Sequence, residues 1–180
     1  MEKQKTLVLT SCLLLSLCSC VNSDIRKNLS QMLDHKIVIP YEQLEKRDCS
    51  YFRDSVKEGR TLTFVVYIDG NQCAPCELSD LSFMDRHYRN DTLWQKISKV
   101  YICDVSPANA NALYSHLCNL RIENDVYFDT CYIFRKRNPL VPDSKMFHTF
   151  VLDREGNVKL VGNPFKNEKL KGLLKEVVEN

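Results

Sequence analysis

The sequence contains little glycine and no internal repeat or low-complexity tract. Its 180 residues include 5 Gly and 6 Pro, which excludes a collagen-like chain, and 44% hydrophobic residues exclude a wholly disordered one. Neither sign of charge dominates, because the chain has 25 Lys and Arg residues and 23 Asp and Glu residues. The net charge of +2 is too small to indicate a nucleic-acid-binding protein. This composition fits one globular domain.

Cysteine is abundant, with nine residues in all, and several lie in an N-terminal segment typical of export. A basic start precedes an apolar run from Leu7 to Leu17, which has the length of a signal-peptide core. The run ends in Leu17-Cys18-Ser19-Cys20, which resembles the bacterial lipobox and its acylated cysteine. The resemblance implies that residues 1–19 form a lipoprotein signal peptide and that Cys20 is the lipidated N-terminus.

A lipidated Cys20 predicts attachment to a membrane of the bacterial cell envelope, facing the periplasm or on the outer membrane. Two or three acyl chains hold a protein on a membrane stably, and disulfides persist in that compartment. Two alternatives remain open: an ordinary secretory peptide, and an N-terminal anchor that stays uncleaved. The membrane is therefore one expected partner of the chain.

The remainder is predicted to contain a tether and N-terminal extension over residues 20–60 and one domain over residues 61–180. In the extension, Lys36–Pro40 is a short edge-strand candidate that ends at a proline. Before it, four apolar residues recur at helical spacing, namely Ile25, Leu29, Met32 and Leu33.

In the domain, predicted strands and helices alternate, and the chain ends with a hairpin and a helix. Thr61–Ile68 is a near-continuous apolar run, of the kind buried on both faces of a sheet. Further strands are predicted at residues 100–105, 126–129, 147–153 and 158–161, and helices after Cys73 and over residues 107–120, 131–137 and 166–178. The last helix is expected to turn inward Leu170, Leu173, Leu174 and Val177. This order predicts an α/β architecture with helices on both faces of a central sheet.

Cys73-Ala74-Pro75-Cys76 follows the first strand directly and opens the next helix. Unpaired N–H groups and the positive end of the helix dipole stabilise a thiolate on Cys73. The spacing places Cys76 within disulfide reach across one helical turn, and Pro75 stiffens the loop without losing an intrahelical hydrogen bond. We therefore expect Cys73 to be the exposed nucleophile and Cys76 the more buried resolving thiol.

The strand, the Cys-x-Pro-Cys motif and the terminal Phe-Val-Leu-Asp-Arg-Glu-Gly-Asn-Val hairpin resemble the thioredoxin-like family over residues 60–180. The resemblance is to its membrane-tethered TlpA/ResA-type and redoxin-like members. It implies a thioredoxin-like fold, with a central mixed sheet flanked by helices, and a thiol–disulfide oxidoreductase that exchanges disulfides with exported envelope proteins. It implies no bound cofactor.

Three positions depart from the family pattern. Gln72 replaces the tryptophan that often precedes the motif, and Tyr67 stands where a buried acid is common. Asp69 is a nearby substitute for that acid, although its place at a strand end suggests solvent exposure. Phe147 occupies the position of the cis-proline that faces the motif, and we expect a trans bond there because a cis bond before Phe costs about 3–4 kcal/mol. Loss of the proline leaves more room beside the sulfurs, and His148 then has two interpretations. It approaches the sulfurs, where it raises thiolate character or serves as a third metal ligand, or it lies on the outer face of the hairpin.

Other cysteines leave alternatives open. Cys103 lies in a predicted buried strand and is expected to act as a small hydrophobe, whereas Cys131 follows a strand end, where a resolving or regulatory thiol is one interpretation. The pairing of Cys49, Cys103, Cys118 and Cys131 does not follow from the sequence.

Competing interpretations of the motif are a purely structural disulfide and half of a zinc site, although no second pair stands at ligand spacing. The runner-up function is a non-catalytic thioredoxin-like lipoprotein that binds a protein partner or a metal.

Overall fold

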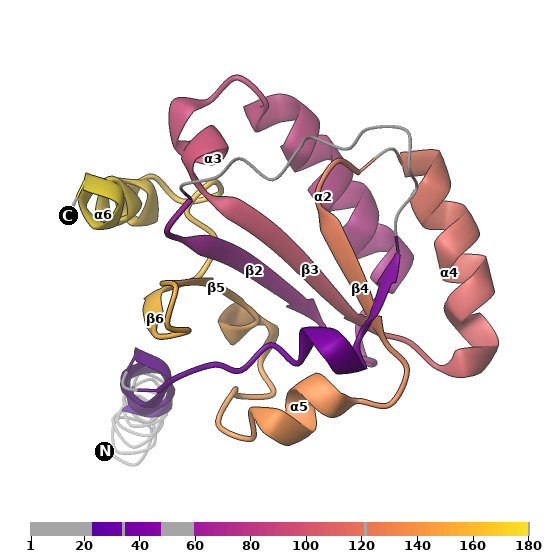
Figure 1. Cartoon of the computed structure of the whole chain (residues 1–180). Coiled ribbons are helices and arrows are strands. Elements are labelled where there is room, and N and C mark those ends of the chain that lie inside the picture. The colour runs from indigo at the N-terminus through magenta and orange to yellow at the C-terminus, as the bar shows by residue number, and fades with distance from the viewer. Residues whose placement is uncertain (1–22, 34, 48–59, 121, 180) are drawn as a thin grey trace, which may run out of the picture.

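The computed structural model describes residues 23–33, 35–47, 60–120 and 122–179, and its centre is a six-stranded mixed sheet (Figure 1). The strand order is β1-β4-β3-β2-β5-β6. Three parallel strands lie at its middle: β2 (Thr63–Ile68), β3 (Ser98–Asp104) and β4 (Asp125–Asp129). The remaining strands, all antiparallel to their neighbours, are β1 (Glu45–Arg47), β5 (Thr149–Leu152) and β6 (Val158–Val161). The predicted mixed α/β sheet is confirmed.

Helices cover both faces of this sheet, as the alternation predicted. The first face packs against α2 (Ala74–Tyr88), α3 (Thr92–Lys96), α4 (Pro107–Leu120) and α6 (Glu168–Glu179). The other face packs against a helix over residues 23–33, α5 (Ile133–Arg137) and the neighbouring 3-10 turn η2 (Lys145–Phe147). A second 3-10 turn, η1 (Tyr41–Gln43), leads into β1.

Strand β2 contributes side chains to both faces, which explains its unbroken apolar sequence. Phe64, Val66 and Ile68 join the cluster under α2 and α4, while Val65 and Tyr67 join the cluster under α5. A strand alternates its side chains between the two faces of a sheet, so both sets must be apolar when both faces are covered. Strand β2 is therefore fixed between two layers, and the loop that follows it starts from a rigid position.

Two details of the sequence prediction are wrong. Lys36–Pro40 forms no strand and makes only an isolated bridge between Lys36 and Asn157. The Asn138 side chain bonds both the N–H and the C=O of Val38, so it satisfies the groups that a strand partner would take; the edge strand is β1 instead. Leu173 is exposed rather than inward.

Helix α3 was not predicted. It is a single short turn, and the Asp91 side chain caps it by accepting hydrogen bonds from the N–H groups of Leu93 and Trp94, at 2.9 and 3.0 Å. Trp94 then packs edge-on against Phe165, with 4.5 Å between ring centroids. Within the described ranges, no helix is long and apolar enough to cross a membrane.

Candidate active site

The Cys-Ala-Pro-Cys motif lies at the end of central strand β2, where a tight turn leads into α2. The Asp69 carboxylate accepts from the N–H of Asn71 at 2.8 Å, and the Asp69 carbonyl accepts from the N–H of Gln72 at 3.0 Å. Cys73 is the N-cap residue of α2. The motif therefore has a fixed strand on one side and the amino end of a 15-residue helix on the other.

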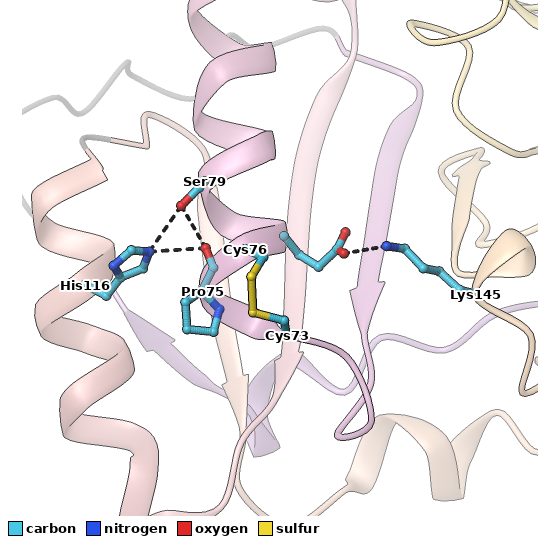
Figure 2. The surroundings of a disulfide bond; sticks show 7 residues. Cys73, Pro75, Cys76, Ser79, His116 and Lys145 are labelled. Atoms are coloured by element: carbon cyan, nitrogen blue, oxygen red, sulfur yellow. Dashed lines mark hydrogen bonds and ion pairs between the residues drawn. A yellow bond between two sulfur atoms is a disulfide. The ribbon is translucent and has the colours of Figure 1, made fainter.

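Cys73 and Cys76 form a disulfide, with 5.3 Å between their Cα atoms (Figure 2). The strand, the CxPC helix and the terminal hairpin with its helix stand in the predicted order along the chain, around the mixed sheet that the resemblance implied. The fold is thioredoxin-like. In this fold the pair lies at the carboxyl edge of the parallel strands, where α/β proteins place their sites.

Both Cys73 and Cys76 are exposed in the disulfide form. That Cys76 is the more buried of the two thiols stays a prediction. Pro75 is exposed as well, and fully buried positions on α2 begin only at Leu78. The disulfide is therefore open to another protein.

Two polar contacts flank the first turn of α2, and Figure 2 draws both. On one side, Lys145 of η2 forms an ion pair with Glu77, which ties the segment before β5 to the helix. On the other side, His116 of α4 lies with Nε2 3.2 Å from the Pro75 carbonyl oxygen and 3.3 Å from Oγ of Ser79. The sequence analysis did not identify His116, because its contact joins two helices far apart in the chain.

Phe147 is 2% exposed and belongs to the core cluster under α5. No cis peptide bond occurs among the described residues, which confirms the trans bond expected there. Because its side chain is buried, Phe147 offers no aromatic surface beside the sulfurs.

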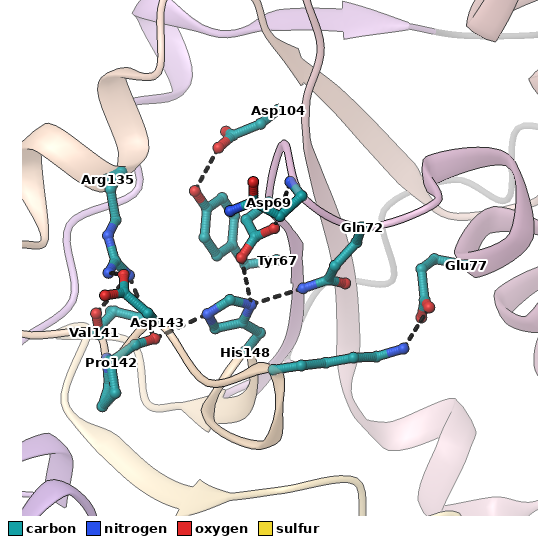
Figure 3. A network of polar contacts seen from close by, with 12 residues as sticks. Tyr67, Asp69, Gln72, Glu77, Asp104, Arg135, Val141, Pro142, Asp143 and His148 are labelled. Atoms are coloured by element: carbon teal, nitrogen blue, oxygen red, sulfur yellow. Dashed lines mark hydrogen bonds and ion pairs between the residues drawn. The ribbon is translucent and has the colours of Figure 1, made fainter.

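His148 is 2% exposed and does not lie on the outer face of the hairpin, which corrects that interpretation. Its Nε2 donates to the carbonyl oxygen of Pro142 at 2.9 Å, and its Nδ1 accepts from the side-chain amide of Gln72 at 2.9 Å (Figure 3). Burial lowers the pKa of His148, which agrees with this neutral arrangement. His148 thus holds the residue directly before Cys73.

Asp104 is a buried acid that the sequence analysis missed. It ends β3, next to the end of β2, and its Oδ2 accepts a hydrogen bond from the Tyr67 hydroxyl at 2.5 Å (Figure 3). Burial raises the pKa of Asp104 to about 6. Burial also raises the pKa of the Tyr67 hydroxyl. The sequence could have indicated this contact, because the carboxyl ends of adjacent parallel strands meet at one edge of the sheet. Asp69, the expected substitute, is instead engaged in the turn before the motif.

The other described cysteines differ in state. Cys103 is fully buried and free, and burial raises the pKa of its thiol. Its side chain therefore packs as a small hydrophobic group, as the sequence predicted. Cys131 is free and exposed. Cys118 is disulfide-bonded, while Cys49 and Cys20 lie outside the described residues. No group of three His, Cys, Asp or Glu in the described part of the chain is placed to hold a metal ion.

Comparison with family models and with curated proteins gives no match. Several solved structures are similar. A provisionally assigned thiol:disulfide interchange protein DsbE from Chlorobium tepidum is 16% identical, with a TM-score of 0.43, over 66% of this chain and 81% of that chain. A thiol-disulfide oxidoreductase from Bacteroides fragilis is 14% identical, with a TM-score of 0.45, over 69% of this chain and 87% of that chain.

A mitochondrial 2-cys peroxiredoxin from Plasmodium falciparum is similar as well, at 17% identity and a TM-score of 0.41, over 66% of this chain and 77% of that chain.

Proposed function

We propose that this chain is a thiol–disulfide oxidoreductase of the bacterial cell envelope, with Cys73 and Cys76 as its redox pair. One observation carries the proposal: an exposed disulfide closes the first turn of α2 at the end of the central strand. A purely structural disulfide is expected to lock segments that are far apart in the chain, whereas this one spans three residues and leaves both sulfurs accessible.

The chemistry is two successive thiol–disulfide exchanges. In the reduced protein, the Cys73 thiolate attacks one sulfur of a client disulfide; a bond from Cys73 to the client forms and the other client sulfur leaves as a thiolate. The Cys76 thiolate then attacks the Cys73 sulfur, which forms the Cys73–Cys76 bond and releases the second client sulfur. The client gains two electrons and this protein loses them, and the reverse sequence oxidises a client dithiol.

Attachment to the envelope through Cys20, and clients that are exported proteins with disulfides or thiols, belong to the same proposal. They are supported by the lipobox resemblance and by the accessibility of the pair. The direction of electron flow depends on the relative stability of the dithiol and disulfide forms, so the reduction potential of the Cys73–Cys76 pair is the measurement that assigns it.

Reduction of insulin disulfides in the presence of dithiothreitol tests the activity. We expect the wild-type chain to accelerate insulin precipitation and Cys73→Ser to abolish the acceleration. Cys131→Ser is the matched control, because it removes an exposed free thiol outside the motif, and it is expected to retain wild-type activity. Equal rates for wild type and Cys73→Ser would reject catalysis and favour the alternative, a non-catalytic binding module. That alternative is favoured by Phe147, which leaves the family's proline position occupied by a buried side chain.

A further inference from the structure

The carbonyl group of Pro75, inside the redox motif, receives two hydrogen bonds from outside the helix backbone. The Ser79 hydroxyl donates to it at 2.8 Å, and His116 of α4 lies with Nε2 at 3.2 Å (Figure 2). The single hydrogen of the Ser79 hydroxyl is directed at Pro75, so the contact between His116 Nε2 and Ser79 Oγ at 3.3 Å needs a hydrogen on the imidazole nitrogen. His116 therefore presents its Nε2–H to both oxygens.

The peptide group that these donors hold is the one that a Cys73 thiolate needs. An N-cap side chain accepts from the N–H of the second or third helical residue. Here the second helical residue is Pro75, which has no N–H, and the third is Cys76. In the disulfide form Cys73 makes no side-chain cap bond. After reduction, the Cys76 N–H is the remaining helical donor at these two positions.

The Cys76 N–H and the Pro75 C=O belong to the same peptide unit. Hydrogen bonds donated to a carbonyl oxygen polarise its amide, which makes the N–H a stronger donor. We infer that His116 is a positioning residue of the redox pair: with Ser79, it orients and polarises the Pro75–Cys76 peptide and thereby stabilises the thiolate of Cys73.

The position of His116 follows from how α4 packs. Leu113 and Leu117 on either side of it are buried in the cluster shared with α2, whereas His116 is half-buried at the edge of the same face. Its ring therefore reaches the first turn of α2 without entering the core. The inference rests on the proposed function for its biological meaning, but the ionisation of Cys73 is measurable whether or not a client is known.

The test is the pKa of the Cys73 thiol in the reduced full-length chain, measured from the pH dependence of iodoacetamide alkylation and read at Cys73 by tandem mass spectrometry. His116→Phe and Ser79→Ala are each expected to raise this pKa. The expected rise is about 0.5 of a pKa unit, because each variant loses one hydrogen bond to the Pro75 carbonyl. His116→Gln keeps an N–H donor on the side chain and is expected to restore part of the wild-type value. A higher thiol pKa also makes the dithiol less stable relative to the disulfide, so the reduction potential is expected to fall in the same two variants.

Ser115→Ala is the matched control. Ser115 donates to the carbonyl of Asn111 four residues earlier in α4, at 3.1 Å, in the same way that Ser79 donates to Pro75. Its loss is expected to leave the pKa of Cys73 unchanged.

A wild-type pKa in both His116→Phe and Ser79→Ala overturns the inference, as does an equal rise in His116→Phe and His116→Gln, which would indicate packing alone. A shifted pKa together with no insulin reduction by the wild type supports the inference and rejects the proposed function. Ser79→Ala keeps the test decisive if His116→Phe fails to fold.

Discussion

The hydroxyl of Tyr67 donates to the carboxylate of Asp104 at 2.5 Å, across the carboxyl ends of two neighbouring parallel strands. Asp104 is 6% exposed, and its second carboxylate oxygen has no hydrogen-bond partner. A buried carboxyl in this setting favours its protonated form. The residue that replaces the family's buried acid, Tyr67, therefore contacts a buried acid supplied by the next strand.

This pair predicts a particular dependence of stability on pH. The folded pKa of Asp104 is about 6, above its usual value of 3.8, so between these pH values the folded chain binds more protons than the unfolded chain. The Asp104 contribution to the free energy of unfolding is therefore full below about pH 4 and is lost as pH rises through about 6, by about 2–3 kcal/mol. Urea unfolding of wild type and Asp104→Asn at pH 4 and pH 7 checks this, because the variant lacks that loss. Asp80→Asn, at an exposed position, is the control. An identical pH dependence in wild type and Asp104→Asn would contradict the prediction.

The buried His148 predicts a dependence of stability on pH that is opposite in sign to that of Asp104. Burial lowers its pKa below 6.5, so below that pH the unfolded chain binds the proton first and the His148 contribution to stability is lost as pH falls. His148→Phe removes this dependence. It also leaves the Gln72 amide and the Pro142 carbonyl without their partner, which is expected to cost about 1–3 kcal/mol. Unfolding free energies at pH 5 and pH 7 give both effects. The control is His87→Phe, at an exposed position on α2, and a loss of similar size there would show that the His148 contacts are not responsible.

The elements that the sequence predicted well are those whose pattern is local. The strand over Thr61–Ile68 and the helix after Cys73 were predicted from patterns among neighbouring residues, and both were correct. The contacts of His116 and Asp104 depend on which helices and strands become neighbours, a relationship between distant segments that spacing does not contain.

Two glycines predict opposite effects of the same substitution. Gly156 has φ +88°, and a Cβ there would lie 2.7 Å from the carbonyl oxygen of Ile37. Gly156→Ala is therefore expected to lower the free energy of unfolding by about 1–3 kcal/mol and to disturb the bond from the Ile37 N–H to the Gly156 carbonyl. Gly172 lies within α6 with no atom within 4 Å of a Cβ, so Gly172→Ala is expected to raise stability by about 0.5–1 kcal/mol. Thermal unfolding of the two variants distinguishes these signs, and equal shifts would contradict the argument.

The lipobox resemblance predicts that Cys20 is acylated. Metabolic labelling of expressing bacteria with a palmitate analogue should label the wild-type chain, and Cys20→Ala should abolish the label. Cys18→Ala is the matched control, because it removes the neighbouring cysteine while leaving the small residue Ser19 before the acylation site. Retention of the label in Cys20→Ala would reject the lipid anchor and favour an ordinary secretory peptide or an uncleaved anchor.

The proposed exchange cycle predicts that the two thiols of the motif differ in reactivity. Both cysteines are exposed, and their places on the helix differ: Cys73 is the N-cap residue and faces the positive end of the α2 dipole, whereas Cys76 lies within the first turn. In the reduced protein we expect iodoacetamide to alkylate Cys73 about tenfold faster than Cys76 at neutral pH.

The same asymmetry predicts which variant traps clients. Cys76→Ser leaves the attacking thiolate but removes the thiol that resolves the mixed disulfide, so client proteins should accumulate on Cys73. Cys73→Ser should trap few, because the first attack is lost. The complexes are detected on non-reducing gels of envelope extracts, where dithiothreitol should release them. The double variant Cys73→Ser, Cys76→Ser is the control for disulfides formed by Cys131, the exposed free thiol. Faster alkylation of Cys76, or equal trapping by the double variant, would mean that the motif does not react in the order proposed, and the binding-module function would then be favoured.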